Sequence, residues 1–138
     1  EGGVIIMTHP TQPDFHPVHH PSYIDFFEQV LADTTDPKVM SEKWEKQYAE
    51  DEWYKHLYRT TYAYHGVHPF YMWYWGSHAL QHCSRIIIVG GDPKTVRRLG
   101  FVPASTMDDA LEIASDVVGR APTITHLHAP PLMVADVS

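Results

Sequence analysis

The residues with the clearest chemical potential form a proline-rich loop from Thr8 to Pro21, with the sequence THPTQPDFHPVHHP. Its imidazoles lie at His9, His16, His19 and His20. An imidazole can transfer a proton near neutral pH, bind a transition metal or pair with a carboxylate. The prolines hold the backbone extended and lower the entropy cost of keeping these side chains in one arrangement. The loop is therefore the first candidate for a functional site.

Two kinds of site can be built from this loop. A substrate-facing or domain-interface site would draw on six candidates: His9, Asp14, His16, His19, His20 and, from further along the chain, His68. A metal site would use His16, His19 and His20. The loop contains no cysteine and no helix carrying H-x-x-x-H, the kinds of spacing by which metal sites usually declare themselves. A rigid surface loop with solvated or locally bonded histidines is the alternative.

The elements beside the loop must position it. Val4 to Met7 predicts a strand directly before it, and Arg85 to Phe101, RIIIVGGDPKTVRRLGF, predicts a strand, a tight turn and a short helix. The β-branched run Ile86 to Val89 has no polar alternation, which is typical of a parallel strand covered on both faces. Open α/β sheets bind ligands outside the carboxyl ends of their strands. We therefore expect the histidine loop to lie at the ligand-binding edge of a parallel sheet.

The Gly90-Gly91 turn resembles a phosphate-binding loop only in part. A dinucleotide fingerprint has the spacing G-x-G-x-x-G, whereas this turn reads G-G-D-P. Asp92 places a carboxylate where an anion would bind, and Pro93 lacks one of the amides that would hold it. We interpret the turn as structural, with Asp92 capping a short helix and Gly100 ending it.

Several helices are expected between the two strands. In the first, Ser22 is the predicted cap, Asp25 takes a capping-box-like position, and Ile24, Phe27 and Leu31 form the inner face. A second begins at Asp36-Pro37. The inner residues expected for a third are Trp53, Leu57, Thr61 and Tyr64.

An aromatic helix over 69–82 is apolar nearly all round. Phe70, Trp73, Ser77 and Leu80 give its inner face, and further aromatic side chains occupy the others. Trp and Tyr are enriched at protein interfaces because they cover a large area and keep a polar tip. This helix is therefore the predicted contact surface for a partner or an oligomer.

The last part of the chain completes the expected fold. A helix capped by Thr106 ends at Gly119, and two strand-like runs follow at Thr123 to His128 and Leu132 to Val137. The order of elements predicts one α/β domain over 1–138. Its architecture would be a three-layer sandwich with a mostly parallel, Rossmann-like sheet and room for antiparallel edge strands.

Composition excludes several functions. A net charge of −7 over 138 residues disfavours nucleic acid and anionic membrane surfaces as partners, since both need a basic face. The sequence shows no membrane-spanning run and no signal peptide. A single cysteine, Cys83, excludes an internal disulfide and fits a cytoplasmic location.

The opening EGGVIIMTH leads almost directly into a strand, and Glu1-Gly2-Gly3 has the pattern of a helix end followed by a short loop. We expect that a preceding part of the protein is missing from this chain.

Several segments together carry a resemblance to a known family. They are EGGVIIMTH, PSYIDFFEQV, RIIIVGG and DPKTVRRLGFVPASTMDDALEIASDVVG. This series resembles the C-terminal domain of the nickel-dependent lactate racemase family, most specifically from Val96 to Gly119. Residues 37–76 are longer and more aromatic than that pattern.

The resemblance implies a two-domain 2-hydroxyacid racemase or epimerase. Such an enzyme carries a nickel pincer nucleotide tethered to a lysine, with a histidine pair moving protons, all in the N-terminal domain. No segment here matches those motifs, so this chain would hold no catalytic residue and no cofactor, and alone it would be inactive. Its partners would be the N-terminal domain and a small 2-hydroxyacid. Its own contribution would be to close over the cleft with substrate-facing side chains.

Two other classes stay open. The histidine loop can be a stand-alone metal-binding module, or the aromatic helix 69–82 can belong to a non-catalytic interaction domain.

Overall fold

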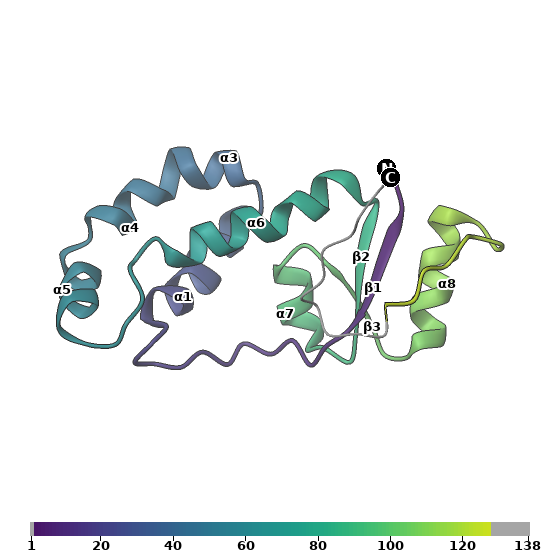
Figure 1. The fold of residues 1–138 in the computed structure, drawn as a ribbon, viewed down its shortest axis with the longest axis horizontal. Coiled ribbons are helices and arrows are strands. Elements are labelled where there is room, and N and C mark those ends of the chain that lie inside the picture. The colour runs from purple at the N-terminus through teal and green to yellow at the C-terminus, as the bar shows by residue number, and fades with distance from the viewer. Residues whose placement is uncertain (1, 128–138) are drawn as a thin grey trace.

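The computed structural model describes residues 2–127 and has two halves, which Figure 1 shows side by side. The sheet half contains the strands β1 (Val4–Thr8), β2 (Arg85–Val89) and β3 (Val102–Ala104) with the helices α7 (Pro93–Arg98) and α8 (Met107–Val118). The helical half contains α1 to α6, and its longest helix, α6 (His68–His82), runs from the far end of this half to the sheet.

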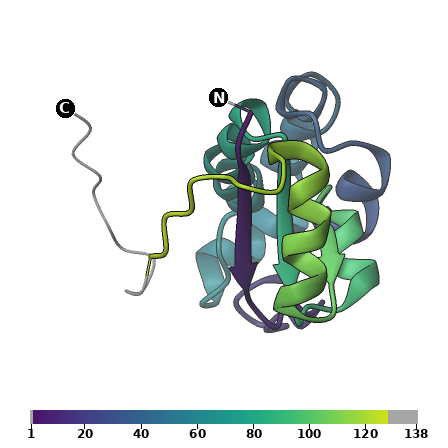
Figure 2. The ribbon, with the colours of Figure 1, turned by 90° about the vertical axis from the view of Figure 1, so that its right-hand side faces the viewer.

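The sheet has the order β1-β2-β3, and both strand pairs are parallel. Ile6 pairs with Ile87, and Ile88 pairs with Pro103, so the predicted buried strand is central. Ile87 packs with Ala110 of α8, which Figure 2 shows across one face of the sheet. On the other face, Ile86 and Ile88 pack with Val96 of α7 and the end of α6. The predicted α/β class with a parallel sheet is confirmed.

The first of the two predicted C-terminal strands does not extend this sheet in its described part, residues 123–127. Residues 123–127 form no strand and are all exposed, with Ile124 at 69% and Leu127 at 64% of full exposure. Their β-branched pattern favours a strand, but a strand also needs a neighbour to pair with and a face to bury. The second predicted strand, Leu132 to Val137, lies outside the described residues.

The turn after β2 has the predicted local geometry. Gly90 and Gly100 adopt φ values of 85° and 77°, the left-handed region that glycine enters without strain. The Asp92 side chain accepts from the backbone N–H of Thr95 at 2.8 Å and from its hydroxyl at 2.7 Å. The Asp92 carboxylate is therefore used as the helix cap.

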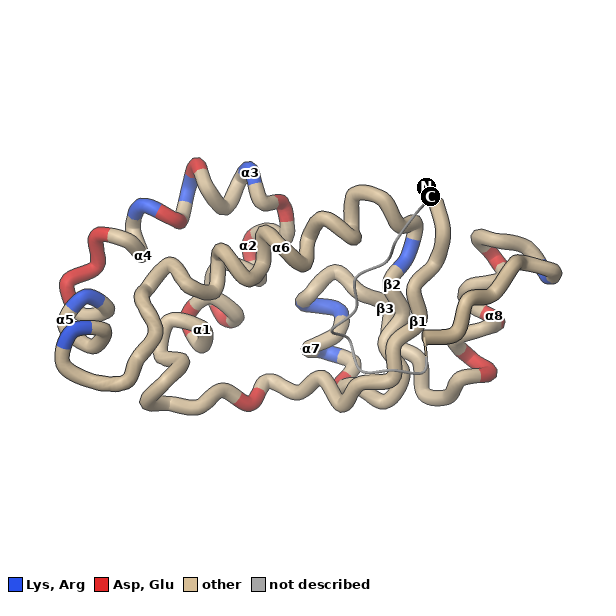
Figure 3. Tube along the Cα trace, in the orientation of Figure 1, with Lys and Arg blue, Asp and Glu red and all other residues tan. Residues whose placement is uncertain are grey.

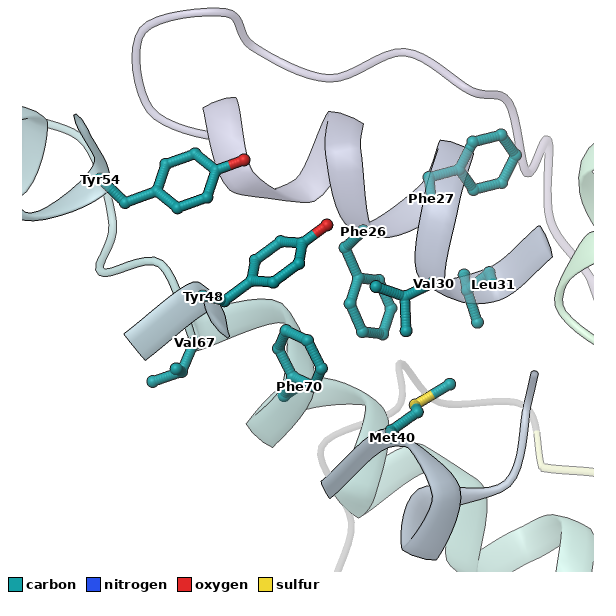
Figure 4. Packing of buried hydrophobic residues seen from close by; sticks show 9 residues of the cluster. All are labelled: Phe26, Phe27, Val30, Leu31, Met40, Tyr48, Tyr54, Val67 and Phe70. Atoms are coloured by element: carbon teal, nitrogen blue, oxygen red, sulfur yellow. The ribbon is translucent and has the colours of Figure 1, made fainter. Parts of the chain in front are cut away.

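The helical half is built from three consecutive helical segments that precede α6. The first comprises α1 (Pro21–Asp25), a π-helical turn η1 (Phe26–Val30) and α2 (Leu31–Asp33). The second comprises α3 (Pro37–Met40), η2 (Ser41–Glu45) and α4 (Lys46–Glu50), and the third is α5 (Glu52–Thr60). Figure 4 shows their shared core, whose buried members are Phe26, Phe27, Val30, Leu31, Met40, Tyr48, Tyr54, Val67 and Phe70.

The predicted cap of the first helix is wrong. The cap residue is His20, whereas Ser22, two residues later, is fully buried and its hydroxyl has no hydrogen-bond partner among the described residues. Asp25 makes no capping box and instead accepts a hydrogen bond from the Tyr54 hydroxyl. The prolines and histidines around position 20 place the helix start before Ser22, with Pro21 in its first turn.

The predicted inner faces of the first and third helices are partly wrong. Ile24 is 38% exposed while Phe26 is buried, because the π-turn at Phe26–Val30 moves the buried stripe away from ordinary α-helical spacing. In α5, Trp53 is 62% exposed and Tyr54 takes the inner position. Within residues 2–127, no helix is long and apolar enough to cross a membrane.

Candidate functional site

A group of histidine and tyrosine side chains from three separate segments meets at the far end of the helical half. The Tyr64 ring stacks on His20 at 5.3 Å and 17°, and on His68 at 4.4 Å and 19°. His20 belongs to the proline-rich loop, Tyr64 to the link after α5, and His68 to the first turn of α6. Tyr64 therefore joins two imidazoles that lie 48 positions apart in the sequence.

Tyr23 forms a second bridge between the same two imidazoles. Its hydroxyl and Nδ1 of His68 share a hydrogen bond of 2.5 Å, and its ring contacts His20 edge-on at 5.0 Å. The loop is tied to the opposite segment by the backbone, where the N–H of Tyr64 donates to the His19 carbonyl at 3.0 Å. This backbone bond explains why the loop and residues 61–65 lie together.

His16 and His19 extend the group, and their hydrogen bonds indicate whether the Nδ1 atom of each ring accepts or donates. The two rings are 4.3 Å apart. Nδ1 of His16 accepts from the backbone N–H of Val18 and of His19, both at 3.3 Å. Nδ1 of His19 lies 2.9 Å from the Tyr62 carbonyl oxygen. Because a carbonyl only accepts, this nitrogen donates, and Nε2 of a neutral His19 is left as an acceptor.

We call His16, His19, His20, Tyr23, Tyr64 and His68 the histidine–tyrosine cluster. Burial lowers the pKa of His20 below its usual 6.5, and the neighbouring His19, His16 and His68 lower it further. Burial also raises the pKa of Tyr23, with a smaller contribution from Tyr64. At neutral pH the cluster therefore offers a neutral imidazole at His20 and a protonated phenol at Tyr23.

Among residues 2–127, no salt bridge joins an acidic side chain to His16, His19, His20 or His68. The chain carries no Asp, Glu, Lys or Arg from residue 60 to residue 84, and Figure 3 shows this stretch, which runs from the end of α5 through α6, without charge colours. Asp14 is the single charged residue of the loop from Thr8 to Pro21. The imidazoles of the cluster are therefore not paired with a carboxylate of the described residues and can pair with an acidic ligand.

An apolar cavity of about 200 Å³ shares Tyr23 with the cluster. It lies between the loop, the first helix and α6, and its lining includes Phe15, Phe27, Pro69 and Met72. Hydrogen-bonding groups next to an apolar hollow are typical of sites for small organic molecules.

Two of the six sequence candidates lie elsewhere. The backbone N–H of His9 donates to the Val89 carbonyl at 3.1 Å, and its ring bonds Thr11 at the end of β1. Asp14 is exposed, partway along the loop. The reason is the extended backbone, since the seven residue-to-residue steps from His9 to His16 can span about 23 Å. The structure therefore brings His16, His19, His20 and His68 together without His9 or Asp14.

The carboxyl edge of the sheet, where we expected the loop histidines, holds a different cavity. Its volume is about 430 Å³, and it is lined by loop residues Gln12 and Pro13 together with Lys94, Thr95 and Arg98. Arg98 is occupied there, since it donates to the Phe27 carbonyl at 3.0 Å.

Metal binding gains no support from the arrangement of the imidazoles. In the described part of the chain, no group of three or more His, Cys, Asp or Glu side chains is placed to hold a metal ion. The proposal of a metal at His16, His19 and His20 stays a prediction. For the nickel cofactor implied by the family resemblance, the described residues likewise offer no donor set, and we derive no step through it.

Sequence reasoning missed Tyr23 and Tyr64 as members of the site. A signal was present in the spacing, because Tyr23 follows His20 by three positions and Tyr64 precedes His68 by four. Searches of protein-family models, curated proteins and solved structures found no match to this chain. Its function is therefore inferred from the residues themselves.

Proposed function

We propose that this chain is the C-terminal domain of a lactate racemase-like 2-hydroxyacid racemase or epimerase, and that the histidine–tyrosine cluster faces the substrate. The observation that carries the proposal is a group of four imidazoles with no acidic partner among the described residues, in a chain of net charge −7. In an acidic protein, basic side chains left unpaired favour an acidic ligand.

The roles of the side chains follow from their hydrogen bonds. A protonated imidazole pairs with the substrate carboxylate, and neutral His20 accepts from its 2-hydroxyl group. Tyr23 holds the ring of His68 through Nδ1, so that Nε2 is the nitrogen left for a ligand. The apolar cavity beside Tyr23 accommodates the remainder of the acid.

The wider context of the proposal rests on the resemblance from Val96 to Gly119. In the complete protein we expect the three strands to belong to a Rossmann-like three-layer sandwich in a cytoplasmic enzyme. An N-terminal domain of the same protein would be the main partner, and it would carry the nickel pincer nucleotide and the proton-transferring histidine pair. This chain alone is expected to be inactive.

Binding of a 2-hydroxyacid tests the proposal. We expect D- or L-lactate to shift the imidazole NMR signals of His20 and His68, and we expect His20→Ala to weaken binding. His78→Ala is the matched control, because His78 is an exposed histidine of α6 outside the cluster. Equal lactate binding by wild type and His20→Ala would contradict the proposal, and so would the same response to propylamine, which carries no carboxylate.

A second function is favoured by the exposed face of α6. Tyr71 is 51%, Met72 46% and Trp75 75% exposed, which is unusual for three large side chains on one helix. We propose this face as the oligomer or domain contact. Light scattering of wild type and Trp75→Ala over a range of concentrations tests it, and a monomer at every concentration would argue against self-association.

A further inference from the structure

A second, separate cavity lies on the other side of α1, between α1 with η1 and α4 with α5. Its volume is about 200 Å³, and every lining residue carries a polar group: Asp25, Gln29, Gln47, Tyr48, Asp51 and Tyr54. Nothing in the histidine–tyrosine cluster contributes to it. Its chemistry therefore needs its own explanation.

Tyr48 supplies the first observation that points to a ligand. The side chain is 3% exposed, and its hydroxyl group has no hydrogen-bond partner among the described residues. Its ring stacks on Tyr54 at 5.5 Å and 24°, and Figure 4 shows both hydroxyl groups pointing to the same side, towards α1. A buried hydroxyl without a partner destabilises the fold, so its position at a polar cavity indicates a bound group.

The second observation is the charge of the cavity. Asp25 accepts from the Tyr54 hydroxyl and from Nε2 of Gln29, and Oδ1 of Asp51 accepts from the backbone N–H groups of Trp53 and Tyr54. Within residues 2–127, neither carboxylate takes part in a salt bridge. Two carboxylates with no cation between them make the cavity negative.

The electrostatics of the tyrosines agree with this charge. Burial raises the pKa of Tyr48, and Asp25 and Asp51 raise it further. Burial and the hydrogen bond to Asp25 do the same for Tyr54. Both phenols stay protonated at neutral pH, so the cavity gains no further negative charge and keeps hydroxyl oxygens that can accept.

We infer that this cavity binds a small organic cation whose ammonium or guanidinium N–H groups donate to Asp25, Asp51 and the Tyr48 hydroxyl. The cavity volume of about 200 Å³ is several times the roughly 30 Å³ that one water occupies in the liquid. The cavity is therefore large enough for a small organic molecule, and a bare metal ion would fill only a small part of it. The ligand set agrees, since the described residues include no group of three metal-binding side chains. Charged N–H donors and carboxylate acceptors form the stronger class of hydrogen bonds.

Thermal unfolding and calorimetry of the full 138-residue chain test this inference. The probes are methylguanidinium and ethylammonium, with tetramethylammonium as a cation that has no N–H donor and Ca²⁺ as a metal. We expect the first two to bind and raise the melting temperature, and the last two to have no effect. Binding of tetramethylammonium as tight as that of ethylammonium, or of Ca²⁺ alone, would overturn it.

Variants locate the site. Tyr48→Phe should weaken binding about tenfold, because one hydrogen bond to a charged donor is lost. Without ligand the same variant should melt higher than wild type, since it removes the unpaired hydroxyl. Asp25→Asn should abolish binding, while Glu112→Gln makes the same charge change on an exposed residue of α8 and should leave binding unchanged.

Tyr48→Phe keeps the test decisive if Asp25→Asn fails to fold. Wild-type affinity in a folded Tyr48→Phe variant would sink the inference. None of these readouts involves a 2-hydroxyacid or a cluster histidine, so their outcome is independent of the proposed function.

Discussion

The two halves of the molecule differ in how they treat their polar groups. Acidic side chains cap helix starts in both halves, as Asp92 does at α7 and Asp51 at α5, and in the sheet half the buried Thr95 hydroxyl donates to Asp92. In the helical half, two buried hydroxyls, of Ser22 and Tyr48, have no partner among the described residues. The cluster imidazoles likewise form no salt bridge with a carboxylate in the described part of the chain.

This difference indicates that the sheet half is the scaffold and that the helical half is the part that binds ligands. A buried polar group costs stability unless it is satisfied, so a half that leaves such groups open is the half to search for ligands. In the sheet half, polar side chains such as Asp92 and Thr95 bond each other at the start of a helix. The helical half holds both candidate sites, one for an acid and one for a cation, on opposite sides of α1.

The largest effect is expected from breaking the core of the helical half. Phe70 is fully buried and contacts the rings of Phe26 and Tyr48, so Phe70→Ala should lower the free energy of unfolding by about 3–5 kcal/mol. Urea unfolding followed by tryptophan fluorescence measures it, since all four tryptophans lie between residues 44 and 75.

The control for this prediction is Trp75→Ala, which removes a 75% exposed side chain of the same helix and should change stability by about 0.5 kcal/mol or less. Circular dichroism reports both halves, so it also shows whether they unfold together. Coincident transitions would mean that α6 couples the halves, and a separate sheet transition would mean that each is stable alone.

The next effect follows from the proposed function and concerns the activity proposed for the full-length protein. Replacing His16, His19 or His20 by alanine should lower kcat/KM about tenfold or more while the fold persists, because 1.4 kcal/mol of lost transition-state interaction is a factor of ten. His78→Ala should keep the wild-type rate. Near-normal rates in all three cluster variants would mean that these histidines are surface features.

The sheet half was predictable because its signals are local. The buried run at 86–88, the cap at Asp92, the glycine at 100 and the cap at Thr106 each depend on residues within a few positions. The strand predicted over 123–128 is absent at residues 123–127, its described part, because a strand needs a partner strand that a local pattern does not supply.

The helical half was less predictable because distant contacts decide it. The π-turns η1 and η2 change which residues face inward, and ordinary helical spacing does not show them. The four histidines of the cluster were identified as candidates from the sequence. The tyrosines that join them were missed because the bond from Tyr64 to the His19 carbonyl links residues 45 positions apart.

A smaller effect is expected at the cap of α7. Asp92→Ala removes the acceptor of two hydrogen bonds from Thr95 and should destabilise the chain by about 1 kcal/mol. Asp116→Ala, an exposed substitution within α8, is the control for the loss of one charge. A loss of stability as large as that of Phe70→Ala would mean that the turn has a role beyond capping.

The smallest effect is a dependence of stability on pH that originates at His20. Its pKa in the folded chain is lowered from 6.5 by burial and by the neighbouring imidazoles. The unfolded state therefore binds more protons than the folded state just below this value, and stability rises with pH there. The contribution is fully present above pH 6.5 and is lost as the pH falls through the folded pKa.

Melting temperatures between pH 7.5 and 5 measure this contribution, and the slope should be shallower in His20→Gln than in wild type. The proposed binding of an acid by the cluster adds a second expectation. A bound carboxylate favours the protonated imidazoles, so lactate should stabilise wild type more at pH 5.5 than at pH 7.5. An equal slope in the variant would place the pH dependence on other groups. A lactate effect that does not grow on acidification would separate acid binding from the charge of the cluster.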